Sequence, residues 1–178
     1  MIEKAIVFAT QAHEGQLRKG TTRPYILHPT EVGNIVADMT GDEEVIAAAI
    51  LHDTVEDCEG VTEEIIRREF SPRVAELVMQ ESEDKTKTWM ERKTATIEQL
   101  KVAPKEIQMI GLADKLSNMR DIDRDYPECG ETLWERFRMK DKALIGWYYK
   151  SIRESLKDSM QGTRTYEEYC KLVDKNFD

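Results

Sequence analysis

Residues 43–57 read Glu-Glu-Val-Ile-Ala-Ala-Ala-Ile-Leu-His-Asp-Thr-Val-Glu-Asp, and this stretch decides the fold. Two acidic residues come first, seven apolar residues follow, and the remaining six are mostly polar. A helix that is apolar on nearly every side is buried at the centre of a protein. The stretch therefore predicts a central, buried helix over residues 43–57 that ends in polar side chains.

Helical signals continue on both sides of this stretch, whereas sustained strand alternation is absent from the sequence. Apolar residues recur at helical spacing, with prolines, glycines and capping residues between the segments. Helices are predicted over residues 2–13, from Pro29 to Thr40-Gly41-Asp42, from Thr62, from Ser71-Pro72, and over 87–101, 104–119, 131–159 and 165–176. A polar, basic loop is predicted between Gly15 and Tyr25.

These signals predict an all-α fold, a helical bundle with any metal site between its central helices. A chain of 178 residues is long enough for one substantial core. We therefore expect a single domain over residues 1–178, with a motif-bearing core over about 2–124 and C-terminal helices over 131–177.

Composition and charge narrow the class of protein. The chain is 40% hydrophobic and 34% charged, and its formal net charge is −9. An acidic chain lacks the broad basic surface of non-specific nucleic-acid binding, although a local basic pocket can still bind a small phosphorylated ligand. No apolar run is long enough to span a membrane and no signal-peptide pattern begins the sequence, so we expect a cytoplasmic protein without a membrane partner.

The three cysteines are widely spaced and include no Cys-x-x-Cys pair. This spacing indicates neither a disulfide framework nor a structural zinc site. The sequence leaves the oligomeric state open.

Four polar side chains that interrupt apolar runs form the most informative pattern in the chain. They are His28, the adjacent pair His52 and Asp53, and Asp114. Burial of an imidazole or a carboxylate is costly unless a partner satisfies it. Two imidazole nitrogens and two carboxylates suit one divalent metal with room left for water. We predict one divalent metal at these residues, and Mn²⁺, Zn²⁺, Fe²⁺ and Co²⁺ all suit the donor set. The alternative is four separately satisfied core residues.

An acidic pair follows the expected metal site. Glu56 is four residues after His52, and Asp57 is four residues after Asp53. Side chains four apart on a helix are neighbours, at about 5–6 Å between Cβ atoms. This spacing predicts that both carboxylates lie near the metal and transfer protons. The alternative is that they only end a helix, where acidic side chains oppose the helix dipole.

Other polar residues are candidates for substrate contact. Asn118 is four residues after Asp114, so its amide is expected beside the metal. The basic loop between Gly15 and Tyr25 carries Arg18 and Lys19, which suit phosphate contact. The weaker candidates of this kind are Lys85, Lys87, Lys115 and Arg120.

Together these residues resemble the HD-domain phosphohydrolases, and more closely the hydrolase half of the bacterial RelA/SpoT alarmone enzymes and their small stand-alone relatives. The resemblance extends in family order over residues 5–124. The matching segments are Ala12-His13, Gln16-Leu17-Arg18-Lys19, Pro24-Tyr25-Ile26-Leu27-His28-Pro29, Leu51-His52-Asp53-Thr54-Val55-Glu56-Asp57, Asp84-Lys85-Thr86 and Leu112-Ala113-Asp114-Lys115-Leu116-Ser117-Asn118-Met119-Arg120.

The resemblance implies a manganese-dependent 3′-pyrophosphohydrolase that converts (p)ppGpp to GDP or GTP and pyrophosphate. It implies that the four histidine and aspartate residues hold the metal and that Glu56 and Asp57 activate water. It further implies that Arg18 and Lys19 contact the guanine base and phosphates, and that Asn118 contacts the sugar region.

Two other functions agree with the same residues. One is a metal-dependent phosphatase that acts on another nucleotide, such as NADPH. The other is a non-catalytic nucleotide-binding module. The Glu56-Asp57 pair favours an enzyme over a module, because binding alone does not require these two acids.

Overall fold

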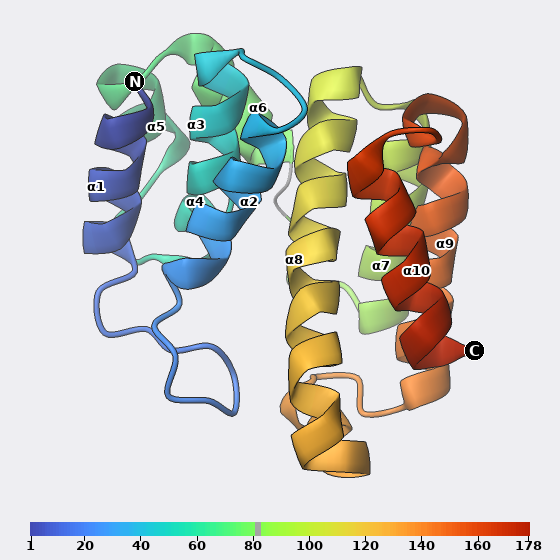
Figure 1. The fold of residues 1–178 in the computed structure, drawn as a ribbon. Helices are drawn as coiled ribbons and strands as arrows, with labels where there is room; N and C mark the ends of the chain where they lie inside the picture. Colours follow the sequence, from blue (N-terminus) through green and yellow to red (C-terminus); the bar gives the residue numbers. More distant parts are fainter. Residues whose placement is uncertain (81–82) are drawn as a thin grey trace.

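The computed structural model describes residues 1–80 and 83–178 as helices joined by loops (Figure 1). The α-helices are α1 (Ile2–Ala12), α2 (Leu27–Ala37), α3 (Glu43–Leu51), α4 (Thr54–Asp57), α5 (Glu63–Glu69), α6 (Pro72–Gln80), α7 (Trp89–Val102), α8 (Lys105–Cys129), α9 (Lys142–Met160) and α10 (Arg164–Phe177), with one 3₁₀ helix, η1 (Gly130–Arg136). These residues include no β-strand, and the all-α prediction is confirmed. None of these helices is both long and apolar enough to cross a bilayer.

Short polar side chains fix where several helices begin. Each accepts a hydrogen bond from a backbone N–H group of the first turn, which would otherwise lack a partner inside the helix. The residues that cap helices in this way are Asp42, Thr62, Thr88, Asp141 and Thr163.

The helices form two groups on either side of the long helix α8 (Figure 1). Helices α1 to α6 lie on one side of α8, and α7, α9 and α10 lie on the other. In the first group α3 packs against α1, α2, α6 and α8. Every residue from Val45 to Leu51 is buried, so α3 is the central helix that the sequence predicted. Buried apolar side chains from both groups form one cluster.

The prediction of one continuous helix over residues 43–57 is wrong, because α3 ends at Leu51 and α4 begins at Thr54. Two side chains bind carbonyl groups in the last turn of α3. His52 Nδ1 lies 2.8 Å from Ala49 O, and Thr54 Oγ1 donates to Leu51 O at 2.7 Å. Such local hydrogen bonds compete with the helical backbone pattern. His52 and Asp53 lie in the turn between the two helices, and His52 Nε2 is 3.0 Å from Asp53 Oδ2.

Two predicted boundaries in the C-terminal half are also wrong. Helix α8 continues to Cys129 instead of ending at Met119. The extra segment packs Ile122, Tyr126 and Cys129 against the core and forms ion pairs with the basic loop. The helix predicted over residues 131–159 is divided into η1 and α9, because Asp141 caps a new helix.

Gly33 allows α2 and α3 to pack closely. A methyl group on Gly33 would lie 2.3 Å from Ile50 Cγ1, and Ile50 is itself buried. We expect Gly33→Ala to lower the free energy of unfolding by about 1–3 kcal/mol, because the two helices must separate. Urea denaturation measures the change. Gly41→Ala is the matched control, because a methyl group there meets nothing within 4 Å; equal effects of the two changes would contradict the packing argument.

Candidate metal centre

Three helical regions bring the predicted metal ligands together. His28 lies in the first turn of α2, His52 and Asp53 form the turn between α3 and α4, and Asp114 lies in the middle of α8. Ligand atoms of His28, His52 and Asp114 all lie within 4.8 Å of one another. Asp53 Oδ2 lies 3.0 Å from His52 Nε2 and 3.7 Å from His28 Nε2. The four side chains therefore converge on one small volume.

The Nε2 atom of the His52 ring faces this volume. Nδ1 of the same ring lies 2.8 Å from the Ala49 carbonyl oxygen, which can only accept, so Nδ1 carries a proton. The buried Nε2 has no hydrogen-bond partner among the described residues, although Asp53 Oδ2 is nearby. A buried nitrogen without a partner is costly, and a metal ion would satisfy it. The donor set therefore fits a divalent cation.

A serine and a glutamate orient the His28 ring in the same way. Ser117 Oγ lies 2.6 Å from Glu31 Oε2, and it must donate its single proton to this carboxylate. His28 Nδ1, 2.9 Å from the same hydroxyl, must then donate to it. This arrangement leaves the lone pair of His28 Nε2 directed at Asp114 Oδ1, 3.2 Å away. Outer partners of this kind fix the tautomer of a metal-binding histidine.

The charges of the cluster favour a cation. Burial lowers the pKa of His28, which keeps this ring neutral. Burial opposes the charged form of His52, but Asp53 and Asp114 outweigh it and raise the pKa of His52 to about 9. Burial also opposes the charge of both carboxylates, but His52 holds the pKa of Asp53 below its usual range, and Lys115 does so for Asp114. A divalent cation would replace the His52 proton and bind two carboxylates that are already ionised.

Two residues of this centre, Tyr25 and Ser117, had no role in the sequence prediction. The Tyr25 hydroxyl donates to Asp53 Oδ2 at 2.6 Å. Both residues lie within the segments that carry the family resemblance, next to His28 and Asp114 in the sequence. This proximity was the only signal for either residue, because a hydroxyl group alone does not indicate a metal site.

The predicted acidic pair follows the metal centre in α4. The Asp57 N–H donates to Asp53 O at 2.9 Å, so the spacing of four residues still stacks these two despite the break in the helix. Lys85 Nζ lies 3.0 Å from Asp57 Oδ1 and 3.4 Å from Glu56 Oε1. Burial raises the pKa of Glu56, which makes its carboxyl group better able to hold a proton. The structure therefore places Lys85 on the acidic pair.

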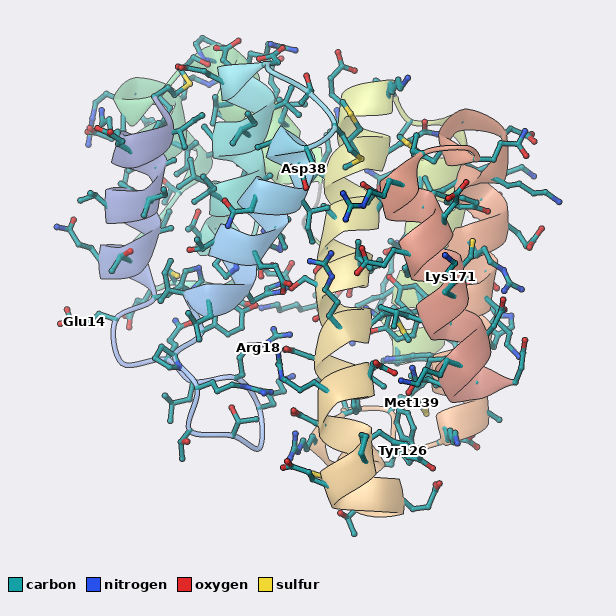
Figure 2. All side chains as sticks on the ribbon, in the orientation of Figure 1. Glu14, Arg18, Asp38, Tyr126, Met139 and Lys171 are labelled. Atoms are coloured by element: carbon teal, nitrogen blue, oxygen red, sulfur yellow. The ribbon has the colours of Figure 1, made fainter. Side chains whose placement is uncertain are left out.

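The predicted substrate residues Asn118 and Arg18 join the centre through hydrogen bonds. Asn118 Nδ2 donates to Asp114 Oδ1 at 2.8 Å, as the spacing along the helix predicted. Arg18 Nη2 donates to Asn118 Oδ1 at 2.8 Å, and Figure 2 shows Arg18 between the basic loop and α8. Lys19 is exposed on the same loop, and no hydrogen bond or ion pair joins it to the centre within residues 1–80 and 83–178.

Ser117→Ala tests the orientation of His28. Loss of the hydroxyl removes the acceptor for the His28 Nδ1 proton, so we expect metal affinity to fall about tenfold, at the lower end of the effects of outer partners. Isothermal titration calorimetry of the metal-free protein with Mn²⁺ measures the affinity. Ser159→Ala is the control, because Ser159 lies in α9 and, among the described residues, its hydroxyl bonds only to the Leu156 carbonyl. An unchanged affinity for Ser117→Ala would contradict the role of the serine.

Helical bundles that gather histidine and aspartate side chains between their central helices are typical of metal-dependent hydrolases. The comparison with known families agrees with this class. The HD domain family matches residues 5–137, and the chain belongs to this family.

Two relatives are similar to this chain over different shares of its length. Human guanosine-3′,5′-bis(diphosphate) 3′-pyrophosphohydrolase MESH1 is 36% identical over 178 residues, 97% of this chain and 92% of the human protein. The guanosine-3′,5′-bis(diphosphate) 3′-pyrophosphohydrolase of Vibrio cholerae is 40% identical over 134 residues, which cover 71% of this chain but 19% of that larger protein.

Two solved structures share the fold. A metazoan orthologue of SpoT that hydrolyses ppGpp superposes with a TM-score of 0.81 at 27% identity, covering 98% of this chain and 94% of that one. The crystal structure of lmo0812 from Listeria monocytogenes superposes with a TM-score of 0.77 at 33% identity, covering 84% of this chain and 98% of that one.

Proposed function

We propose that this chain is a metal-dependent guanosine-3′,5′-bis(diphosphate) 3′-pyrophosphohydrolase, which converts (p)ppGpp to GDP or GTP and pyrophosphate. The observation that carries the proposal is the buried, unpartnered His52 Nε2 in the cluster with His28, Asp53 and Asp114. Such a donor set suits metal-assisted hydrolysis of a phosphoric ester. The human relative with the same activity in its name matches 97% of the chain.

In this proposal His28, His52, Asp53 and Asp114 hold one divalent cation, and we propose Mn²⁺. Two carboxylates and two neutral imidazoles combine the oxygen ligands that Mn²⁺ prefers with nitrogen ligands. A cation bound there lowers the pKa of a coordinated water and polarises a phosphoryl oxygen. The two carboxylates also balance its charge inside the protein.

The acidic pair supplies the proton transfer. Glu56 is half-buried, and burial raises the pKa of its carboxyl group, which favours exchange of a proton with water or with the leaving group. Asp57 is more exposed and is paired with Lys85. Lys85 adds a positive charge next to both acids, where an anionic substrate has to approach.

The basic loop and α8 supply substrate contacts. Arg18 places a positive charge beside Asn118, and Lys19 adds a second one on the exposed part of the same loop. Both charges attract a polyphosphate nucleotide. Asn118 adds a neutral amide next to Asp114, suited to a sugar hydroxyl group. In this proposal the substrate is a small guanine nucleotide. We further propose that the protein is located in the cytoplasm.

A substrate panel tests the proposal. The protein is incubated with Mn²⁺ and ppGpp, pppGpp, NADPH, GTP or dGTP, and released pyrophosphate and orthophosphate are measured separately. We expect pyrophosphate from ppGpp and pppGpp, and none after chelation of the metal. Orthophosphate from NADPH without turnover of ppGpp would instead support the nucleotide phosphatase. Binding of ppGpp without turnover would support a non-catalytic module.

A further inference from the structure

Two ion pairs bind the basic loop (Gly15–Tyr25) to the C-terminal part of α8. Arg18 pairs with Asp121 at 2.7 Å, and Arg23 pairs with Asp125, also at 2.7 Å. Asp121 and Asp125 are four residues apart, so they lie one above the other on the same face of the helix. The loop therefore meets a row of acidic side chains on α8.

Close packing accompanies these ion pairs. Gly20 lies so near Arg136 that a methyl group on it would be 2.6 Å from Arg136 Cδ. Arg136 Nη1 donates in turn to Asp125 Oδ2 at 2.7 Å. Within the loop, Arg18 N–H donates to Arg23 O at 2.9 Å. The loop thus has a defined position against α8.

The Arg18 guanidinium is held on three sides. Its Nε and Nη2 donate to Asp121 Oδ2 at 2.9 and 2.7 Å, and Nη2 also donates to Asn118 Oδ1. Its plane lies over the Tyr25 ring, 5.5 Å from the ring centre. Only 16% of the side chain is exposed. Asn118 and Tyr25 in turn bond to Asp114 and Asp53, so Arg18 is fixed relative to the metal centre.

We propose that Asp121 is a positioning residue that holds Arg18 in the orientation in which it binds the nucleotide, an inference that rests on the proposed function. Asp121 does not itself contact the substrate in this proposal. Its negative charge is offset by Arg18 and by Arg124, three residues further along α8. Removal of the Asp121 charge should therefore increase the affinity for an anionic substrate only slightly. The accompanying loss of the Arg18 orientation should decrease that affinity by more.

Steady-state kinetics of Asp121→Asn distinguish a loss of the Arg18 orientation from the simple removal of a negative charge. We expect the KM for ppGpp to rise about tenfold with kcat within about twofold, because a charge-assisted hydrogen bond that orients a binding group is lost. Simple removal of a negative charge predicts the opposite, a lower KM. Asp123→Asn is the control, because Asp123 pairs with Lys175 and Asn176 on α10. A KM that is unchanged or lower in Asp121→Asn would overturn the proposal.

Two further variants test the route through Arg18. In an Arg18→Ala background, Asp121→Asn should not change KM further, because the group it orients is absent. Asp121→Glu keeps the charge and should recover part of the affinity. Additive effects of the Arg18 and Asp121 changes would overturn the assignment.

Amide hydrogen exchange with Mn²⁺ present tests the positioning without turnover. Exchange at Arg18 and Tyr25 should become several-fold faster in Asp121→Asn and stay unchanged in Asp123→Asn, because the loop loses its ion pair to α8. Unchanged exchange in Asp121→Asn would refute the positioning role even if the enzyme hydrolyses ppGpp. Absence of ppGpp turnover in the wild-type protein would instead refute the proposed function. The exchange rates would still test whether Asp121 positions the loop.

Discussion

Asp53→Ala is expected to remove the metal and, with it, the activity. Asp53 Oδ2 is the carboxylate oxygen nearest to His52 Nε2, and Asp53 is held ionised by the histidines around it. Changes to the outer partners of a metal site cost about 10- to 100-fold in affinity, so loss of a ligand should cost more than about 100-fold. Elemental analysis after dialysis against Mn²⁺ measures the metal content. ppGpp turnover should fall in parallel.

The matched control for this change is Asp38→Ala. Asp38 is exposed at the C-terminal end of α2, and it should keep both metal and activity. Far-ultraviolet circular dichroism checks that both variants remain helical. Undiminished metal in Asp53→Ala would remove Asp53 from the ligand set and leave His28, His52 and Asp114 as the site.

Glu56→Gln is expected to keep the metal and the fold but to lower kcat by about 10²- to 10⁴-fold, the range of general acid–base catalysis. Glutamine has nearly the same shape as glutamate, yet it cannot take up or release a proton. Burial already raises the pKa of Glu56, so the protein environment favours proton exchange at this carboxyl group. Metal analysis and steady-state kinetics on one preparation separate loss of metal from loss of proton transfer.

Glu59→Gln provides the comparison for this second variant. Glu59 is exposed in the turn after α4, three residues from Glu56, and its replacement should leave kcat unchanged. If Glu56→Gln retained near-full kcat with metal bound, the proton transfer would have to be assigned to Asp57 or to bulk water.

The convergence of the four candidate metal ligands was easier to predict from the sequence than the shapes of the helices that carry them. His28, His52, Asp53 and Asp114 stand out because each is polar within an apolar run, a local signal that needs no knowledge of the fold. The break between α3 and α4 could not be predicted in the same way. It depends on hydrogen bonds from His52 and Thr54 to carbonyl groups, which helical periodicity does not report.

Contacts between segments that are far apart in the chain could not be predicted from local sequence patterns. Arg18 and Asp121 are 103 residues apart, and nothing local indicates that they pair. The end of α8 was predicted too early, although Ile122, Tyr126 and Cys129 continue its apolar face at helical spacing. Residues 120–129 are largely charged, and they are helical where arginines of the basic loop and of η1 neutralise their acids.

A single helix, α8, sets the spacing between the candidate metal centre and the proposed nucleotide contacts. Asp114, Ser117, Asn118 and Asp121 follow one another at intervals of three, one and three residues, so they occupy one face of α8. Each residue of an α-helix turns the chain by about 100°. An insertion of one residue between Asn118 and Asp121 would rotate Asp121 away from Arg18 while Asp114 stayed in place. This part of the chain should therefore tolerate changes of side chain far better than any change in length.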